Sequence, residues 1–85
     1  METNPILRKA ILEVVENQLR NDDPPQTRET LARLMGAGHS RSEATQMIAS
    51  VVAVEMFDVM STEKPFDQER FAERLRLLPE PPYEK

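Results

Sequence analysis

The residues of this sequence that could do chemistry are few and widely spaced. The single histidine, His39, precedes Glu43 by four residues, a spacing that would put both side chains on one side of a helical start. Glu55 and Asp58 lie three residues apart, and paired carboxylates can serve acid-base catalysis or hold a divalent cation. A zinc site needs at least three protein ligands, and no local motif supplies a third. His39, Glu55 and Asp58 therefore form a candidate polar site without a complete motif.

Complete catalytic and cofactor motifs are absent from the sequence. It contains no cysteine, which excludes disulfides, thiolate metal sites and cysteine nucleophiles. It contains no glycine-rich phosphate loop, no serine elbow and no Glu-x-x-His ligand pattern. Helix capping explains Ser40 and Ser42 better than a catalytic role beside His39 does. We therefore expect no enzymatic activity, no cofactor and no metal, with a carboxylate-dependent metal enzyme built on Glu55 and Asp58 as a third alternative.

Length and charge bound the class of protein. A chain of 85 residues forms one domain with a thin core, and such chains often rely on well-packed helices or on a second copy of themselves. Fifteen acidic and 11 basic residues give a net charge of −4 with mixed signs, so no phosphate-binding stripe is evident. The longest uncharged run, residues 44–54, is about 11 residues, short of a membrane span, and no export signal is visible. The sequence predicts a cytoplasmic protein.

Helices must position these residues, because prolines and capping residues occur where helices would begin. The expected helices and the proline-rich tail that follows them span about residues 5–20, 24–35, 41–61, 68–78 and 79–85. Asn4 and Asp23 are the expected caps of the first two helices, and Gly36 and Gly38 mark the end of the second. No strand is predicted, because the β-branched residues lie within a helical frame.

The clearest local signals lie before the third and fourth helices. Ser40 and Glu43 form the pattern of a capping box, in which each side chain satisfies a backbone N–H of the other residue. Asp67 is the expected cap of the fourth helix, with Phe66 packing on Phe71 as a hydrophobic staple. The predicted fold class is all-α, a compact four-helix domain with up-down or orthogonal packing around a long apolar third helix.

Helical spacing predicts which residues of the first, second and fourth helices face the core. These residues are Ile6, Leu7, Ala10, Ile11, Val14, Val15 and Leu19, then Thr27, Leu31, Leu34 and Met35, then Phe71, Ala72, Leu75 and Leu78. The opposite sides of the first and fourth helices carry mixed charges and are expected to be solvated.

The third helix has two apolar faces instead of one. The first face is made of Ala44, Met47, Ile48 and Val51. The second, nearly opposite, is made of Ala49, Ala53, Met56 and Met60, with Phe57 at its margin. A helix apolar all round usually runs through the centre of a domain. Alternatively the second face is an interface, because small alanines allow a close approach and methionine and phenylalanine suit a partner surface.

Two acidic residues interrupt the first apolar face. Glu55 and Asp58 continue the line of Met47 and Val51 at helical spacing, where further apolar residues would be expected. We expect these acids to be solvated at a helix end that projects past the domain, with Arg8 or an arginine of the fourth helix as a possible ion-pair partner.

The segment 30–44 invites comparison with a helix-turn-helix DNA reader. A typical motif would place apolar residues at the positions of Ser42 and Thr45, and would follow them with a polar recognition helix. Here the following helix is among the most apolar stretches, and Arg41 is its only base. A nucleic-acid-binding regulator is therefore the alternative function, and we do not expect nucleic acid as the main partner.

Features spread over most of the chain resemble a family of small helical bacterial proteins of unassigned function. These features are Pro24-Pro25, Glu29-Thr30-Leu31, Arg33-Leu34, Gly38, Glu43-Ala44, the long apolar helix and Leu78-Pro79. They are caps, turns and core positions, so the resemblance implies a compact helical bacterial domain and carries over no catalytic or binding residue.

The sequence as a whole predicts a non-enzymatic protein-protein interaction or accessory protein. We expect it to self-associate as a homodimer through one helix face, made of Ala49, Ala53, Met56, Phe57 and Met60. A different protein partner, bound by the same face or by the Pro79 to Pro82 tail, is the nearest alternative.

Overall fold

Four helices make up the part of the chain that the computed structural model describes, residues 5–80. They are α1 (Pro5–Asn21), α2 (Pro25–Gly36), α3 (Arg41–Thr62) and α4 (Gln68–Leu77). No strand occurs among these residues, so the predicted all-α fold class is confirmed. Each expected helix boundary lies within one residue of the observed one. The expected cap Asn4 and most of the proline-rich tail lie outside the described residues.

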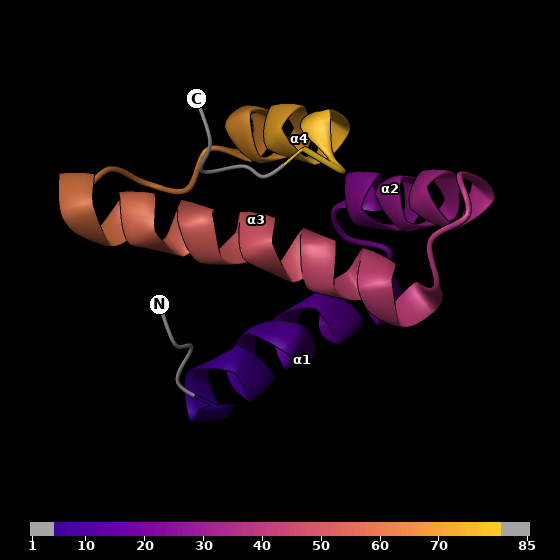
Figure 1. Cartoon of the computed structure of the whole chain (residues 1–85). Coiled ribbons are helices and arrows are strands. Elements are labelled where there is room, and N and C mark those ends of the chain that lie inside the picture. The colour runs from indigo at the N-terminus through magenta and orange to yellow at the C-terminus, as the bar shows by residue number, and fades with distance from the viewer. Residues whose placement is uncertain (1–4, 81–85) are drawn as a thin grey trace.

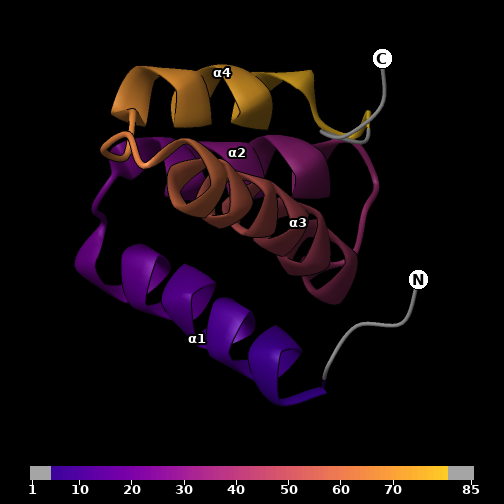
Figure 2. The ribbon, with the colours of Figure 1, turned by 90° about the vertical axis from the view of Figure 1, so that its left-hand side faces the viewer.

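The long helix α3 runs through the centre of the molecule and contacts all three other helices. Figure 1 shows α1 on one side of α3, with α2 and α4 on the other. The view along α3 from the side on which it ends shows the same order, from α1 through α3 to α4 (Figure 2). The ribbons of α1 and α3 lie close together where α1 ends and α3 begins, and they diverge toward the start of α1 and the end of α3 (Figure 1).

The core lies around the first half of α3, and most of the predicted core positions are confirmed. Its buried apolar residues are Ile11, Val15, Leu19, Leu34, Ala44, Ile48, Val51, Val52, Phe71, Leu75 and Leu78. The prediction was wrong for Ile6, Leu7, Ala10 and Val14 of α1 and for Met35 of α2, which are all exposed. Because α1 diverges from α3 toward its own start, its first turns are left uncovered, and its buried residues begin at Ile11.

The caps of α3 and α4 agree with the sequence prediction. Ser40 Oγ accepts a hydrogen bond from Glu43 N at 3.0 Å, and Glu43 Oε1 accepts one from Ser40 N at 2.9 Å. Asp67 Oδ1 accepts hydrogen bonds from the backbone N–H groups of two residues in the first turn of α4. The rings of Phe66 and Phe71 lie with centroids 5.6 Å apart. These local contacts fix where α3 and α4 begin.

The sequence prediction was wrong for the start of α2 and is confirmed for its end. The N-cap is Pro24 and makes no side-chain capping bond, so the predicted cap Asp23 was wrong. Asp23 instead donates its backbone N–H to the carbonyl of Gln18 at 3.1 Å, which closes the end of α1. At the other end Gly38 has a φ of 106°, and the N–H of His39 returns to the Leu34 carbonyl at 3.1 Å, as expected for a glycine helix stop.

The apolar character of α3 also bears on the membrane question. Within the described residues, α3 is one helix that is long and apolar enough to cross a membrane. The sequence prediction did not identify α3 as such a helix, because it considered only the longest run without charges, whereas a membrane-spanning helix can include a few charged residues. The central helix of a globular protein can be equally long and apolar, and a third (33%) of the apolar stretch of α3 is buried inside this structure.

Candidate functional site

The five predicted interface residues of α3 fall into two groups in the structure. Ala49 and Ala53 are half-buried and pack against the protein's own core. Met56, Phe57 and Met60 have 41%, 68% and 75% of their surface exposed. The helix thus contacts its own neighbours along the first part of the second apolar face and leaves the last part uncovered, at the end from which α1 diverges (Figure 1).

We call Met56, Phe57 and Met60 the exposed strip. Met56 and Met60 lie one helical turn apart on the same side of α3, with Phe57 beside them. Large exposed apolar side chains gathered at one place mark interaction surfaces more often than single ones do. Methionine adapts to irregular partner surfaces and phenylalanine offers a large contact area, so the composition of the strip suits protein binding.

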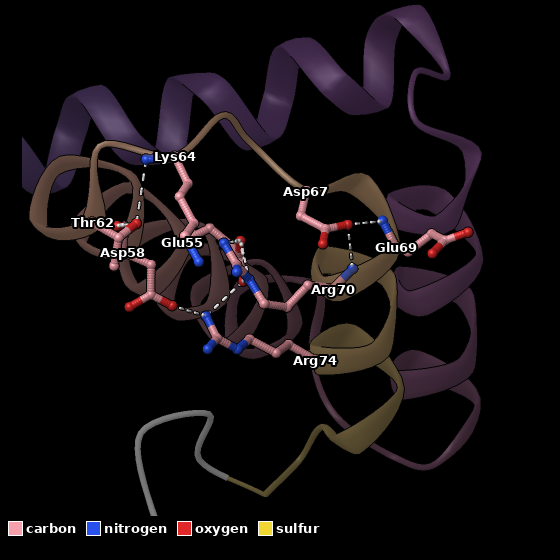
Figure 3. Close-up of polar contacts among 8 residues, drawn as sticks. All are labelled: Glu55, Asp58, Thr62, Lys64, Asp67, Glu69, Arg70 and Arg74. Atoms are coloured by element: carbon pink, nitrogen blue, oxygen red, sulfur yellow. Dashed lines mark hydrogen bonds and ion pairs between the residues drawn. The ribbon is translucent and has the colours of Figure 1, made fainter.

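The opposite side of the same turns carries a buried charge. Glu55 is 1% exposed, and its carboxylate contacts two guanidinium groups of α4 (Figure 3). Arg70 Nε lies 3.2 and 3.3 Å from the two carboxylate oxygens, and Arg74 Nη1 lies 2.5 Å from Oε2. The expectation that Glu55 is solvated was wrong, because α4 covers it. The alternative pairing with arginines of the fourth helix is confirmed, and it involves both of them.

Asp58 joins the same group of charges. Arg74 Nη1 lies 2.8 Å from Asp58 Oδ2 and so bridges the two carboxylates. The hydrogen bond with Glu55 raises the pKa of Arg70 above its ordinary value. Two carboxylates and two guanidinium groups balance in charge, and we call these four residues the Glu55 network. Such close, direction-specific bonds fix the position of the partners as well as attract them.

The sequence contains the signals for this network, but they lie on two helices. Arg70 and Arg74 are four residues apart and therefore share one side of α4. Glu55 and Asp58 are three residues apart on α3, which has no basic residue in its last turn. A carboxylate as buried as that of Glu55 needs compensation, and the arginines of α4 supply it. The spacings allow the pairing, and the packing of α4 against α3 brings it about.

The structure does not assemble the three predicted polar residues into one site. His39 lies in the turn before α3, with Nδ1 3.9 Å from Glu43 Oε1. Glu55 follows sixteen positions later, which corresponds to about 24 Å along a helix. Among residues 5–80, no group of three or more histidine, aspartate or glutamate side chains could hold a metal ion. Both carboxylate oxygens of Glu55 and one of Asp58 contact guanidinium groups.

Arginines also connect the helices at places that sequence reasoning missed. Arg33 of α2 donates to the carbonyls of Leu75 and Leu78, both at 2.9 Å, and so caps the end of α4. Arg41 at the start of α3 makes two contacts of 3.1 Å with Glu16 of α1. The hydrogen bond from Arg41 lowers the pKa of Glu16. Both arginines contact partners distant in sequence, so local patterns could not identify them.

No protein-family model matches the chain, and comparisons with curated proteins and with solved structures find no match either. This finding is consistent with the resemblance seen in the sequence, which attaches no family name to the chain. The all-α architecture therefore rests on the structure itself, and functional conclusions rest on the exposed strip and the Glu55 network.

Proposed function

We propose that this protein is a non-enzymatic interaction or accessory protein that self-associates through the exposed strip of α3. The observation that carries the proposal is the exposure of Met56, Phe57 and Met60 on consecutive turns of one helix, at 41%, 68% and 75%. Burial of such a side chain from full exposure contributes about 1.5 to 3 kcal/mol, so covering the exposed part of each of these three contributes a fraction of that. The cytoplasmic, bacterial setting belongs to the same proposal and is supported by composition and by the family resemblance.

The chemistry of the strip favours a second copy of the chain as the partner. The second apolar face of α3, from Ala49 to Met60, carries no ionisable side chain, whereas the chain as a whole has a net charge of −4. Two copies would repel each other at an acidic surface, but not at this one. In a two-fold dimer the same patch meets itself, which an uncharged apolar strip allows without any unpaired charge.

The size of a stable interface sets how far the contact must extend. A standard protein interface covers about 800 Å² on each partner. The described chain has an accessible surface of 6064 Å², so such an interface would take roughly an eighth of it. The three side chains of the strip form the apolar centre of such an area, and polar neighbours would form its rim.

The test is solution mass measured by light scattering over a wide concentration range. We expect the wild type to be a dimer and Phe57→Glu to be a monomer, because the substitution puts a charge in the centre of the contact. Leu77→Glu is the matched control, since Leu77 is 58% exposed on α4 and lies outside the strip. Circular dichroism checks that both variants are folded. A wild type that stays monomeric throughout, or a dimeric Phe57→Glu, would refute the proposal.

A further inference from the structure

The last two turns of α3 are attached to the rest of the molecule mainly by charges. Glu55 is the last buried residue of the helix, and every residue from Met56 to Thr62 is exposed or half-buried. α1 has diverged from α3 at this end, and the end of α3 reaches past the start of α4, so that the connector to α4 runs back along it (Figure 1). The ion pairs between these turns and α4 are those of the Glu55 network.

The same turns carry the exposed strip on their other side. Glu55 is adjacent in sequence to Met56, and Asp58 is adjacent to Phe57, so the two sets of side chains leave the same stretch of backbone in different directions. Figure 3 shows the arginine side chains of α4 reaching the carboxylates of α3 from one side. Any movement of this stretch of backbone relative to α4 therefore moves both sets of side chains.

The network provides a fixed position that apolar contacts alone would not. Apolar packing is non-directional, whereas the guanidinium of Arg70 meets both oxygens of Glu55 and that of Arg74 meets both acids. Beyond the network, the helix end is completed by local bonds, in which Thr62 Oγ1 donates to the Asp58 carbonyl at 2.7 Å. A carboxylate as buried as that of Glu55 is stable only with its partners in place, so α4 and the end of α3 hold each other in one arrangement.

We infer that the Glu55 network is a positioning device for the docking surface, which keeps the turns that bear Met56, Phe57 and Met60 helical and fixed before a partner binds. The inference rests on the proposed self-association and adds the residues that control it. A surface ordered in advance loses less conformational entropy on binding, so a network on the buried side raises the affinity of the exposed side without touching the partner.

The test compares two isosteric substitutions that each remove one ion-paired carboxylate from a contact of α3. Glu55→Gln weakens the network, and Glu16→Gln weakens the contact with Arg41 at the opposite end of the helix. Dimer dissociation constants are measured by sedimentation where both variants are folded. Amide hydrogen exchange is followed for residues 56–62 and, as an internal reference, for residues 11–19 of α1.

We expect Glu55→Gln to weaken the dimer by roughly tenfold or more, and to speed exchange in residues 56–62 by roughly tenfold more than in residues 11–19, whose exchange reports the global stability. Glu16→Gln should change neither quantity by more than about twofold. A merely global loss of stability would speed exchange in both segments by the same factor and would refute the positioning role. Unchanged exchange in residues 56–62, or an unchanged dissociation constant, would refute it as well.

Two further outcomes keep this inference separate from the proposed function. If the wild type is a monomer, the proposed self-association fails, and the exchange of residues 56–62 in the two variants still decides whether the network holds these turns. If Glu55→Gln does not fold, Arg74→Gln replaces it, because Arg70 then still pairs with the buried carboxylate. The same exchange pattern is expected for Arg74→Gln, and its absence would refute the inference.

Discussion

The two halves of α3 are held in the molecule by different forces. In the first half, Ala44, Ile48 and Val51 are fully buried and belong to the apolar core that all four helices form. In the second half the one fully buried side chain is Glu55, held by two arginines of a single helix. The first half has neighbours on both of its apolar faces, whereas the second half has a neighbour on one side and an exposed apolar strip on the other.

The difference shows how a helix can be fixed from one side only. Apolar packing needs neighbours around the helix to exclude water, and the divergence of α1 removes one of them. Ion pairs with good geometry attract in a defined direction, so the arginines of α4 can hold the second half without covering its other side. An open apolar face and a buried ion-pair network therefore occur on the same turns for one structural reason.

The largest expected effect tests the apolar half. Ile48 is fully buried, so Ile48→Ala should lower the free energy of unfolding by about 3 kcal/mol through lost contacts and a cavity. Met60→Ala, at a position 75% exposed, should lower it by less than about 0.5 kcal/mol at dilution. Urea unfolding followed by circular dichroism measures both. Equal losses would mean that the second half is buried in solution as deeply as the first.

The next effect tests the charged half. Arg74→Ala should lower the free energy of unfolding by about 2 kcal/mol, because the buried Glu55 keeps only one of its two arginines. Arg76 is exposed on the same helix, and Arg76→Ala is the control, expected to change stability by no more than about 0.5 kcal/mol. The same urea experiment applies. Similar values for the two variants would show that the network contributes little to holding α4.

The smallest effect tests an exposed ion pair at the first half of α3. The hydrogen bond from Arg41 lowers the pKa of Glu16 in the folded protein, so its contribution is complete above the ordinary value of 4.5 and is lost as the pH falls through the lower, folded pKa. Because both side chains are about half exposed, Glu16→Gln should cost only a few tenths of a kcal/mol at neutral pH. Unfolding in acid well below 4.5 should no longer distinguish the variant from the wild type. A difference that persists there would assign the effect to another cause.

Much of the fold could be predicted because its signals are local. Pro5, the capping box of Ser40 and the cap at Asp67 act within one helical turn, so helix starts were predicted to within a residue. The missed cap at Asp23 has a local reason too, since Pro24 itself takes the capping position and helix α2 begins at Pro25. Failures of this kind concern the choice between adjacent residues, not the existence of an element.

The candidate site could be predicted only in part, because exposure depends on where neighbouring helices lie. The five residues of the second apolar face were identified by spacing, yet spacing treats Ala53 and Met60 alike. The structure separates them, since the core reaches Ala53 and not Met60. In the same way, spacing placed Glu55 on a core-facing line but could not show which helix would neutralise it.

The sequence by itself determined four helices, their starts and the apolar faces of α3, because these depend on bonds and spacings within a few residues. The tertiary structure alone decided which part of each face is covered. The divergence of α1 leaves Met56, Phe57 and Met60 exposed, and the arginines of α4 allow Glu55 to be buried. Burial and pairing depend on the distance between segments far apart in the chain, and only the packed arrangement of the helices sets that distance.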